Sequence, residues 1–217
     1  MAWSARGSNQ ETEWQFATDD LEGVVRWLTR DLVAGYRLEP AGRVELYDTY
    51  FDTAGWHVIT AGYTCRVRRN GEHAEATLKS TAIMADGLRQ REEITEAVEP
   101  ARIPDLQSLP GRFGEALRLI LRGQQLVQLF DIHTSRELFS LADTAGTLGE
   151  VAIDTATIPR GDALPPERLV RIEVEVQSIE QALPFVEALR RETGVEPAPA
   201  SKFEAALEAT GQRSPLG

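Results

Sequence analysis

The chain has 217 residues, of which 42% are hydrophobic and 26% charged, a globular balance that excludes an intrinsically disordered protein. Its 34 Asp and Glu residues against 23 Lys and Arg give a net charge of −11, which disfavours binding to duplex nucleic acid or to an anionic membrane surface. The single cysteine, Cys65, excludes an internal disulfide and fits a reducing compartment, so we expect a cytoplasmic protein.

The length predicts one large domain, at about 150 residues per domain. We expect an N-terminal tail over residues 1–10, a single domain over 11–212 and a C-terminal tail over 213–217, which would also suit the start of a linker. We expect no membrane partner, because no uncharged apolar stretch approaches the ~18 residues that a membrane span needs.

The first half of the chain predicts β-strands joined by short turns. The expected strands cover residues 11–16, 43–53, 63–69, 73–80 and 89–98. The Asn70-Gly71 pair favours the tight turn of a β-hairpin between the third and fourth of them. Helices are expected over 18–34, with Thr18 as N-cap and Gly35 as the stop, and over 113–122.

The second half predicts four more strands and two helices. The expected strands cover residues 125–132, 134–141, 148–158 and 169–177. Ser178 with Gln181, and Ser201 with Glu204, form capping-box patterns that open helices, and Pro184 predicts a kink or a late start in the first of these. The resulting class is α+β, mainly antiparallel β, and closure into a barrel with flanking helices is expected.

Several expected strands alternate an apolar face with a strongly charged one. The charged or polar faces carry Glu11, Glu13 and Gln15; Arg66 and Arg68; Lys79; Arg91 and Glu93; and Glu173 and Glu175. One solvated face of a sheet would explain any single strand. The grouping of like charges by strand instead indicates a metal ion that faces the carboxylates and a polyanion that faces the cations.

Lysine use points the same way, because the chain has two lysines, Lys79 and Lys202. Lys202 follows the expected N-cap Ser201, where the helix dipole disfavours a cation. An anionic ligand at this helix N-terminus would reverse that penalty.

In chain order these residues resemble the CYTH proteins, also called triphosphate tunnel metalloenzymes. The motifs are Glu11-Thr12-Glu13-Trp14-Gln15, with glutamine where the family has lysine; Tyr47-Asp48-Thr49-Tyr50-Phe51-Asp52; Arg66-Val67-Arg68; Thr77-Leu78-Lys79; Arg91-Glu92-Glu93; Arg136; Ala152-Ile153-Asp154; Ile172-Glu173-Val174-Glu175; and Ser201-Lys202-Phe203. The resemblance spans about residues 10–205. It implies a closed tunnel of eight antiparallel strands with inward-pointing charges, and Mg²⁺- or Mn²⁺-dependent hydrolysis of a triphosphate.

The resemblance also implies roles for individual residues. The metal ligands would be Glu11, Glu13, Glu173, Glu175 and Asp154, because hard divalent cations prefer carboxylate oxygens. The substrate-binding residues would be Gln15, Arg66, Arg68, Lys79, Arg91, Arg136 and Lys202, although Arg91 would equally serve to pair with Glu93. Glu93, Asp154 and Lys79 would act in catalysis.

Three functions stay open from the sequence. The leading interpretation is hydrolysis of inorganic triphosphate; the first alternative is a non-catalytic module that binds polyphosphate or a nucleotide, and the second is an adenylate cyclase. Gln15 bears on this choice, because it brings no charge where the family has lysine. This replacement would mean slower turnover or another substrate, a tunnel kept for binding, or a change without effect. The resemblance also suggests a C-terminal helical domain in a longer natural chain.

Overall fold

The computed structural model describes residues 8–81, 86–99, 105–161 and 164–215. Within them the strands are β1 (Ser8–Ala17), β2 (Arg37–Thr53), β3 (Tyr63–Asn70), β4 (His73–Ser80), β5 (Leu88–Ala97), β6 (Leu126–Ala142), β7 (Thr147–Ile158), β8 (Glu167–Val176) and β9 (Glu196–Pro197). The helices are α1 (Leu21–Leu28), α2 (His57–Thr60), α3 (Gly111–Leu121), α4 (Ile179–Thr193) and α5 (Lys202–Ala209).

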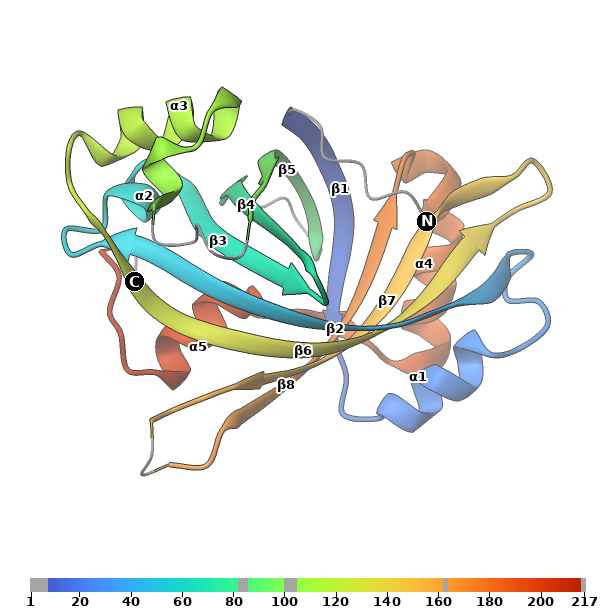
Figure 1. Ribbon diagram of the computed structural model, residues 1–217. Coiled ribbons are helices and arrows are strands. Elements are labelled where there is room, and N and C mark those ends of the chain that lie inside the picture. The colour runs from blue at the N-terminus through green and yellow to red at the C-terminus, as the bar shows by residue number, and fades with distance from the viewer. Residues whose placement is uncertain (1–7, 82–85, 100–104, 162–163, 216–217) are drawn as a thin grey trace.

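The strands form one antiparallel sheet in the order β5-β4-β3-β2-β6-β7-β8-β1-β9 (Figure 1). An additional pairing of β5 with β1 closes the first eight strands into a barrel, and β9 adds a short extension beside the end of β1. The predicted closed eight-stranded tunnel with flanking helices is therefore confirmed.

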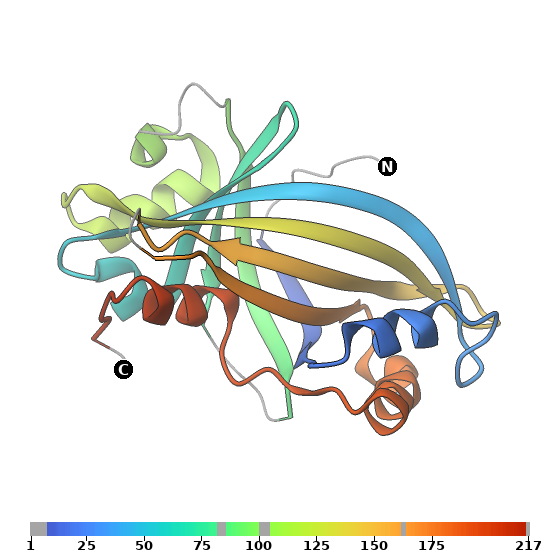
Figure 2. The same ribbon diagram turned by 90° about the horizontal axis from the view of Figure 1, so that it is seen from below.

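The two longest strands, β2 and β6, cross the whole molecule side by side (Figures 1 and 2). The expectation of separate strands over 125–132 and 134–141 is wrong, because β6 continues through His133 without a turn. His133 pairs with Tyr47 of β2 on one side and Thr157 of β7 on the other, and these pairings on both sides keep the chain extended. β2 likewise begins earlier than expected, at Arg37.

The first helix is shorter than the apolar spacing predicts. Asp20, not Thr18, is the N-cap of α1, since its carboxylate accepts the Gly23 N–H at 2.8 Å. Thr29 ends the helix, and Leu32, which lies within the expected range 18–34, is 62% exposed. Periodic apolar residues continue past Leu28, but the chain turns there to enter β2, which the spacing does not encode.

The other helices agree better with their end signals. α4 begins directly after its N-cap Ser178 and ends at Gly194, with Pro184 inside it, so a late start is not seen. α5 has the predicted capping box of Ser201 and Glu204. α2 was not expected, since four residues are too few to carry a helical period.

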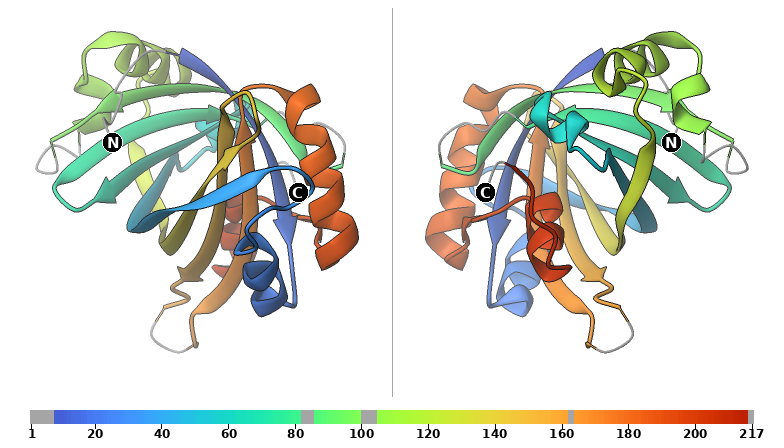
Figure 3. Two further views of the ribbon diagram at one scale, coloured as in Figure 1. Left: turned by 90° about the vertical axis from the view of Figure 1, so that its right-hand side faces the viewer. Right: turned by 90° about the vertical axis from the view of Figure 1, so that its left-hand side faces the viewer.

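Helices α1, α3 and α4 lie against the outside of the barrel (Figure 3). Two hydrophobic clusters lie between these helices and the strands. In the first, Trp27 of α1 and Phe185 of α4 pack together with Phe16 of β1. In the second, Phe113 of α3 is buried with Cys65 of β3 and other apolar residues of β3–β5. The apolar halves of the alternating strands therefore face outward, under helices, and their charged halves are left to face the barrel interior.

A third cluster lies at one end of the barrel, where α5 packs on the sheet (Figure 2). Phe203 of α5 contacts Tyr50 and Phe130, with ring centroids 5.4 and 5.5 Å apart. Phe130 and Arg136 lie six residues apart on β6 and so share the inward face. α5 therefore closes part of the interior and carries Lys202 into it.

No helix in the described residues is long and apolar enough to cross a membrane.

Candidate functional site

The barrel interior holds a cavity of about 130 Å³ with a charged lining. Of the residues expected in the site, those that line it are Glu11, Glu13, Gln15, Arg66, Arg68, Lys79, Arg91, Arg136, Glu173, Glu175 and Lys202. Glu93 and Asp154 do not line the cavity, but each contacts a cation that does. The alternation along separate strands thus brings the whole expected set to one place.

The Glu-x-Glu motifs of β1 and β8 lie on paired strands. Glu13 is in register with Glu175, and Gln15 with Glu173. Gln15 Nε2 donates to Glu13 Oε1 at 2.7 Å and to Glu173 Oε1 at 3.1 Å. The Oε1 atom of Gln15 is buried and has no hydrogen-bond partner among the described residues. The glutamine therefore bridges two carboxylates and leaves an unused acceptor.

Lys79 lies between two carboxylates, contacting Glu11 and placing its Nζ 2.8 Å from Glu93 Oε1. Burial raises the pKa of Glu93, but the attraction of Lys79 and Arg66 outweighs burial and brings that pKa to about 2. Burial lowers the pKa of Lys79, and its attraction to Glu11 and Glu93 reverses the shift, so the pKa is raised. Both groups are therefore charged at neutral pH.

Asp154 is at the centre of a second ion-pair group. Arg136 donates to both of its carboxylate oxygens at 2.7 Å each, and Lys202 contacts one of them. Glu173 accepts from Arg136 at 2.5 Å and lies 2.9 Å from Lys202 Nζ. Burial raises the pKa of Glu173, but Lys202 and Arg136 hold it well below its usual range. Asp154 has no exposed surface, and it holds Arg136 and Lys202 in place beside the cavity.

Asp48 of β2, for which the sequence predicted no role, is a buried partner of Arg66 and Arg68 of β3. Arg68 donates to its two oxygens at 2.7 Å each, and Arg66 Nη1 lies 3.8 Å from it. Burial raises the pKa of Asp48, but the attraction of Arg68 outweighs it and brings the pKa to about 2. Its position two residues before Tyr50, which lines the cavity, would have predicted that Asp48 also faces inward.

The sequence did not predict a role in the site for three further charged residues. Arg89 and Glu204 line the cavity, and Glu150 is in register with Glu175. Arg89 alternates with Arg91 on β5, so the period of a strand would have found it. Burial raises the pKa of Glu175 to about 7, and repulsion from Glu11, Glu93 and Glu150 adds to this shift. The attraction of Lys79 opposes it.

The donor set suits a divalent metal chemically. Glu13, Glu175 and Glu150 form a row of carboxylates across β1, β8 and β7, and the unused oxygen of Gln15 lies beside it. Oxygen ligands of this kind are those that Mg²⁺ and Mn²⁺ prefer. Among the described residues, however, no three His, Cys, Asp or Glu side chains converge closely enough to hold an ion. Glu11, Glu13 and Glu173 contact cations instead, and a metal would have to displace these contacts.

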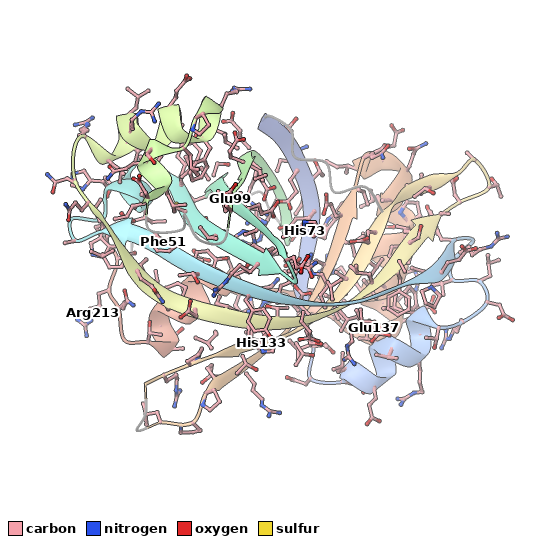
Figure 4. All side chains as sticks on the ribbon, in the orientation of Figure 1. Phe51, His73, Glu99, His133, Glu137 and Arg213 are labelled. Carbon is pink, nitrogen blue, oxygen red and sulfur yellow. The ribbon has the colours of Figure 1, made fainter. Side chains whose placement is uncertain are left out.

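The histidines lie apart from this cavity. His133, on β6 in Figure 4, stacks on Tyr47 with ring centroids 4.4 Å apart, and its Nε2 lies 2.9 Å from Glu45. His57 contacts Thr53 Oγ1 at 2.7 Å. Cys65 is fully buried in the cluster beneath α3, as its place on the apolar face predicts.

Known structures share this fold. HpAC1 from Hippeastrum, a candidate adenylyl cyclase with a dominant triphosphatase activity, is 19% identical with a TM-score of 0.65, covering 95% of this chain and 98% of its own. A candidate adenylate cyclase from Bacillus halodurans is 20% identical with a TM-score of 0.65, covering 92% and 98%. A protein from Pyrococcus horikoshii OT3 is 17% identical with a TM-score of 0.51, covering 91% and 98%.

At these identities the structural matches show the fold alone. No curated protein sequence matches the chain significantly. The sequence itself matches the CYTH domain over residues 18–206, which is most of its length and includes the charged motifs from Arg66 to Lys202. This chain therefore belongs to the CYTH family.

Proposed function

We propose that this protein hydrolyses a triphosphate inside its tunnel with the help of Mg²⁺ or Mn²⁺, and that inorganic triphosphate is its substrate. The observation that carries the proposal is the convergence of inward-facing cations from four strands and α5 on one cavity that Glu11, Glu13, Glu173 and Glu175 also line. Hydrolysis by HpAC1, a protein of the same fold, supports the choice of reaction.

The cations would bind the phosphates. Arg66, Arg68, Lys79, Arg91, Arg136 and Lys202 line the cavity, and each is an ion-pair partner of a carboxylate. Phosphate oxygens would take over these contacts as charge-assisted hydrogen bonds, for which arginine is well suited. Asp48 and Asp154 keep the cations in place, so that little reorganisation is needed when the substrate arrives.

The carboxylates would hold the metal, with Glu11, Glu13, Glu173 and Glu175 as its ligands. A bound divalent ion neutralises phosphate charge and makes a bound water more acidic. Gln15 orients Glu13 and Glu173 through its amide, and Glu93 orients Lys79 towards the phosphates. Asp154 does not line the cavity and contacts Arg136 and Lys202, so in our proposal it positions these cations and is not assigned to the metal.

The test is phosphate release from inorganic triphosphate, ATP and thiamine triphosphate in Mg²⁺, Mn²⁺ or chelator. We expect metal-dependent release, fastest with inorganic triphosphate, that is lost in the Glu173→Ala/Glu175→Ala variant. The matched control is Glu22→Ala/Glu39→Ala, which also replaces two glutamates by alanine. The side chains of these glutamates are 91% and 68% exposed. Equal rates in the site variant and the wild type would overturn the proposal.

A second candidate, a module that binds polyphosphate or a nucleotide without turnover, is favoured by Gln15. Its neutral amide occupies a site between two carboxylates where the family has a cation. Tight binding of triphosphate without phosphate release would support this candidate. Formation of cyclic AMP and pyrophosphate from ATP, measured in the same assay, would support an adenylate cyclase instead.

A further inference from the structure

Arg89 differs from every other cation that lines the cavity. It belongs to β5, directly opposite Glu13 of β1, and its side chain is 4% exposed. Glu13, its cross-strand neighbour, already accepts from Gln15 and contacts Arg91. Among the residues that the structure describes, Arg89 is the cavity-lining Lys or Arg with no carboxylate within 4.0 Å.

Within the part of the chain that the structure describes, the side chain of Arg89 also has no hydrogen-bond partner. Its Nε is buried and unbonded, so the guanidinium is neither neutralised nor solvated at that atom. Burial lowers the pKa of Arg89, and more distant attraction to Glu204, Glu173 and Glu11 offsets this in part. A buried charge without a partner destabilises a fold. Such a residue in a cavity is suited to a ligand of opposite charge.

Arg171 shows that burial alone does not explain this arrangement. It is also 4% exposed and lies on the neighbouring part of β8, where its charge repels that of Arg89. Its guanidinium donates to the carbonyls of Val170 at 2.9 Å and Ala200 at 3.2 Å, and it does not line the cavity. Arg171 is thus bound to the backbone, while Arg89 faces the cavity with its donors unused.

We propose that Arg89 is a further phosphate-binding residue, which holds one end of the polyphosphate beside the N-terminus of α5. Ser201, Lys202 and Glu204 of that helix line the same cavity, so the end group would lie between Arg89 and Lys202. The inference rests on the proposed function in its choice of ligand. It adds a cation on the strand that pairs with β1, where Gln15 contributes none.

The test separates binding from turnover and from stability. Sodium triphosphate is titrated calorimetrically into Arg89→Gln, Arg89→Lys, Arg171→Gln and the wild type, in chelator and at constant ionic strength. Urea unfolding of each variant is measured without ligand. We expect Arg89→Gln to bind at least about tenfold more weakly, because a charge-assisted contact is lost, while its urea midpoint stays the same or rises. Arg89→Lys should recover part of the affinity.

Arg171→Gln controls for the loss of a buried positive charge. It should lower the urea midpoint, because two backbone carbonyls lose their donors, and should weaken binding less than Arg89→Gln does. Wild-type affinity in Arg89→Gln, a lower midpoint in that variant, or an equal loss in both variants would each overturn the inference.

These outcomes are distinct from those of the proposed function. Binding that depends on Arg89 but without metal-dependent phosphate release would overturn hydrolysis and keep the phosphate site. Metal-dependent phosphate release together with triphosphate binding that does not depend on Arg89 would overturn the phosphate site and keep hydrolysis. A wild type that neither binds triphosphate in chelator nor releases phosphate with metal would overturn both.

Discussion

Gln15 and Glu173 face each other across β1 and β8, and the amide of Gln15 donates to Glu173 Oε1 at 3.1 Å. The same Nε2 donates to Glu13, so one neutral side chain links the carboxylates of both Glu-x-Glu motifs. Because the amide of Gln15 is neutral, it offsets the negative charge of neither Glu13 nor Glu173. The consequence for catalysis depends on whether a cation here would help bind phosphate.

Gln15→Lys tests that question directly. We expect phosphate release from inorganic triphosphate to rise by about tenfold, because a charged donor between the carboxylates adds roughly 1.5–3 kcal/mol of interaction with the phosphates. The control is Gln124→Lys, which makes the same change at an exposed site beyond α3. An unchanged rate in Gln15→Lys would mean that this position does not limit turnover.

Asp48 should make the fold sensitive to acid. Its pKa is lowered from 3.8 to about 2, so the ionised form contributes stability that is present above pH 4 and lost as the pH falls towards 2. The shift corresponds to about 2 kcal/mol. Asp48→Asn should cost about 3 kcal/mol at pH 6, because Arg68 is left buried and unpaired.

Urea unfolding at pH 6 and pH 3 measures this effect. The difference between the wild type and Asp48→Asn should shrink by about 1 kcal/mol at pH 3, since part of the wild-type contribution has gone. Asp19→Asn, at an exposed site, should show neither effect. A constant difference between the two pH values would argue against the lowered pKa.

The two serine N-caps provide a matched pair. Ser201 accepts the Glu204 N–H at 3.2 Å in α5, and Ser178 accepts the Gln181 N–H at 3.4 Å in α4. Each Ser→Ala variant should lose about 1 kcal/mol of unfolding free energy. Calorimetry should show weaker triphosphate binding in Ser201→Ala alone, because this cap holds Lys202 at the cavity. Equal affinities in both variants would show that the cap does not position Lys202.

Packing beneath α3 should dominate the stability of that end of the barrel. Leu117 has no exposed surface, while Leu119, two residues on, is 79% exposed. Leu117→Ala should cost about 2–5 kcal/mol in denaturant unfolding, and Leu119→Ala no more than about 0.5 kcal/mol. Similar losses would mean that α3 is not packed on β3–β5 as described.

The sequence predicted the faces of the strands well, and the ends of elements less well. Alternation placed Trp14 and Phe16 outward and Glu13 and Gln15 inward, because a strand has a period of two whatever its neighbours. The single strand through His133 and the early end of α1 were missed. Both depend on pairing and packing with distant segments, to which a local pattern is blind.

The sequence by itself determined which side chains of each strand share its charged face, since charge and period are local properties. The tertiary structure decided the partners of those side chains. It brought Asp48 to Arg68 and Asp154 to Lys202, and it placed no carboxylate of the described residues within 4.0 Å of the Arg89 guanidinium. These outcomes depend on strand register and on the docking of α5, and both follow from contacts between residues far apart in the chain.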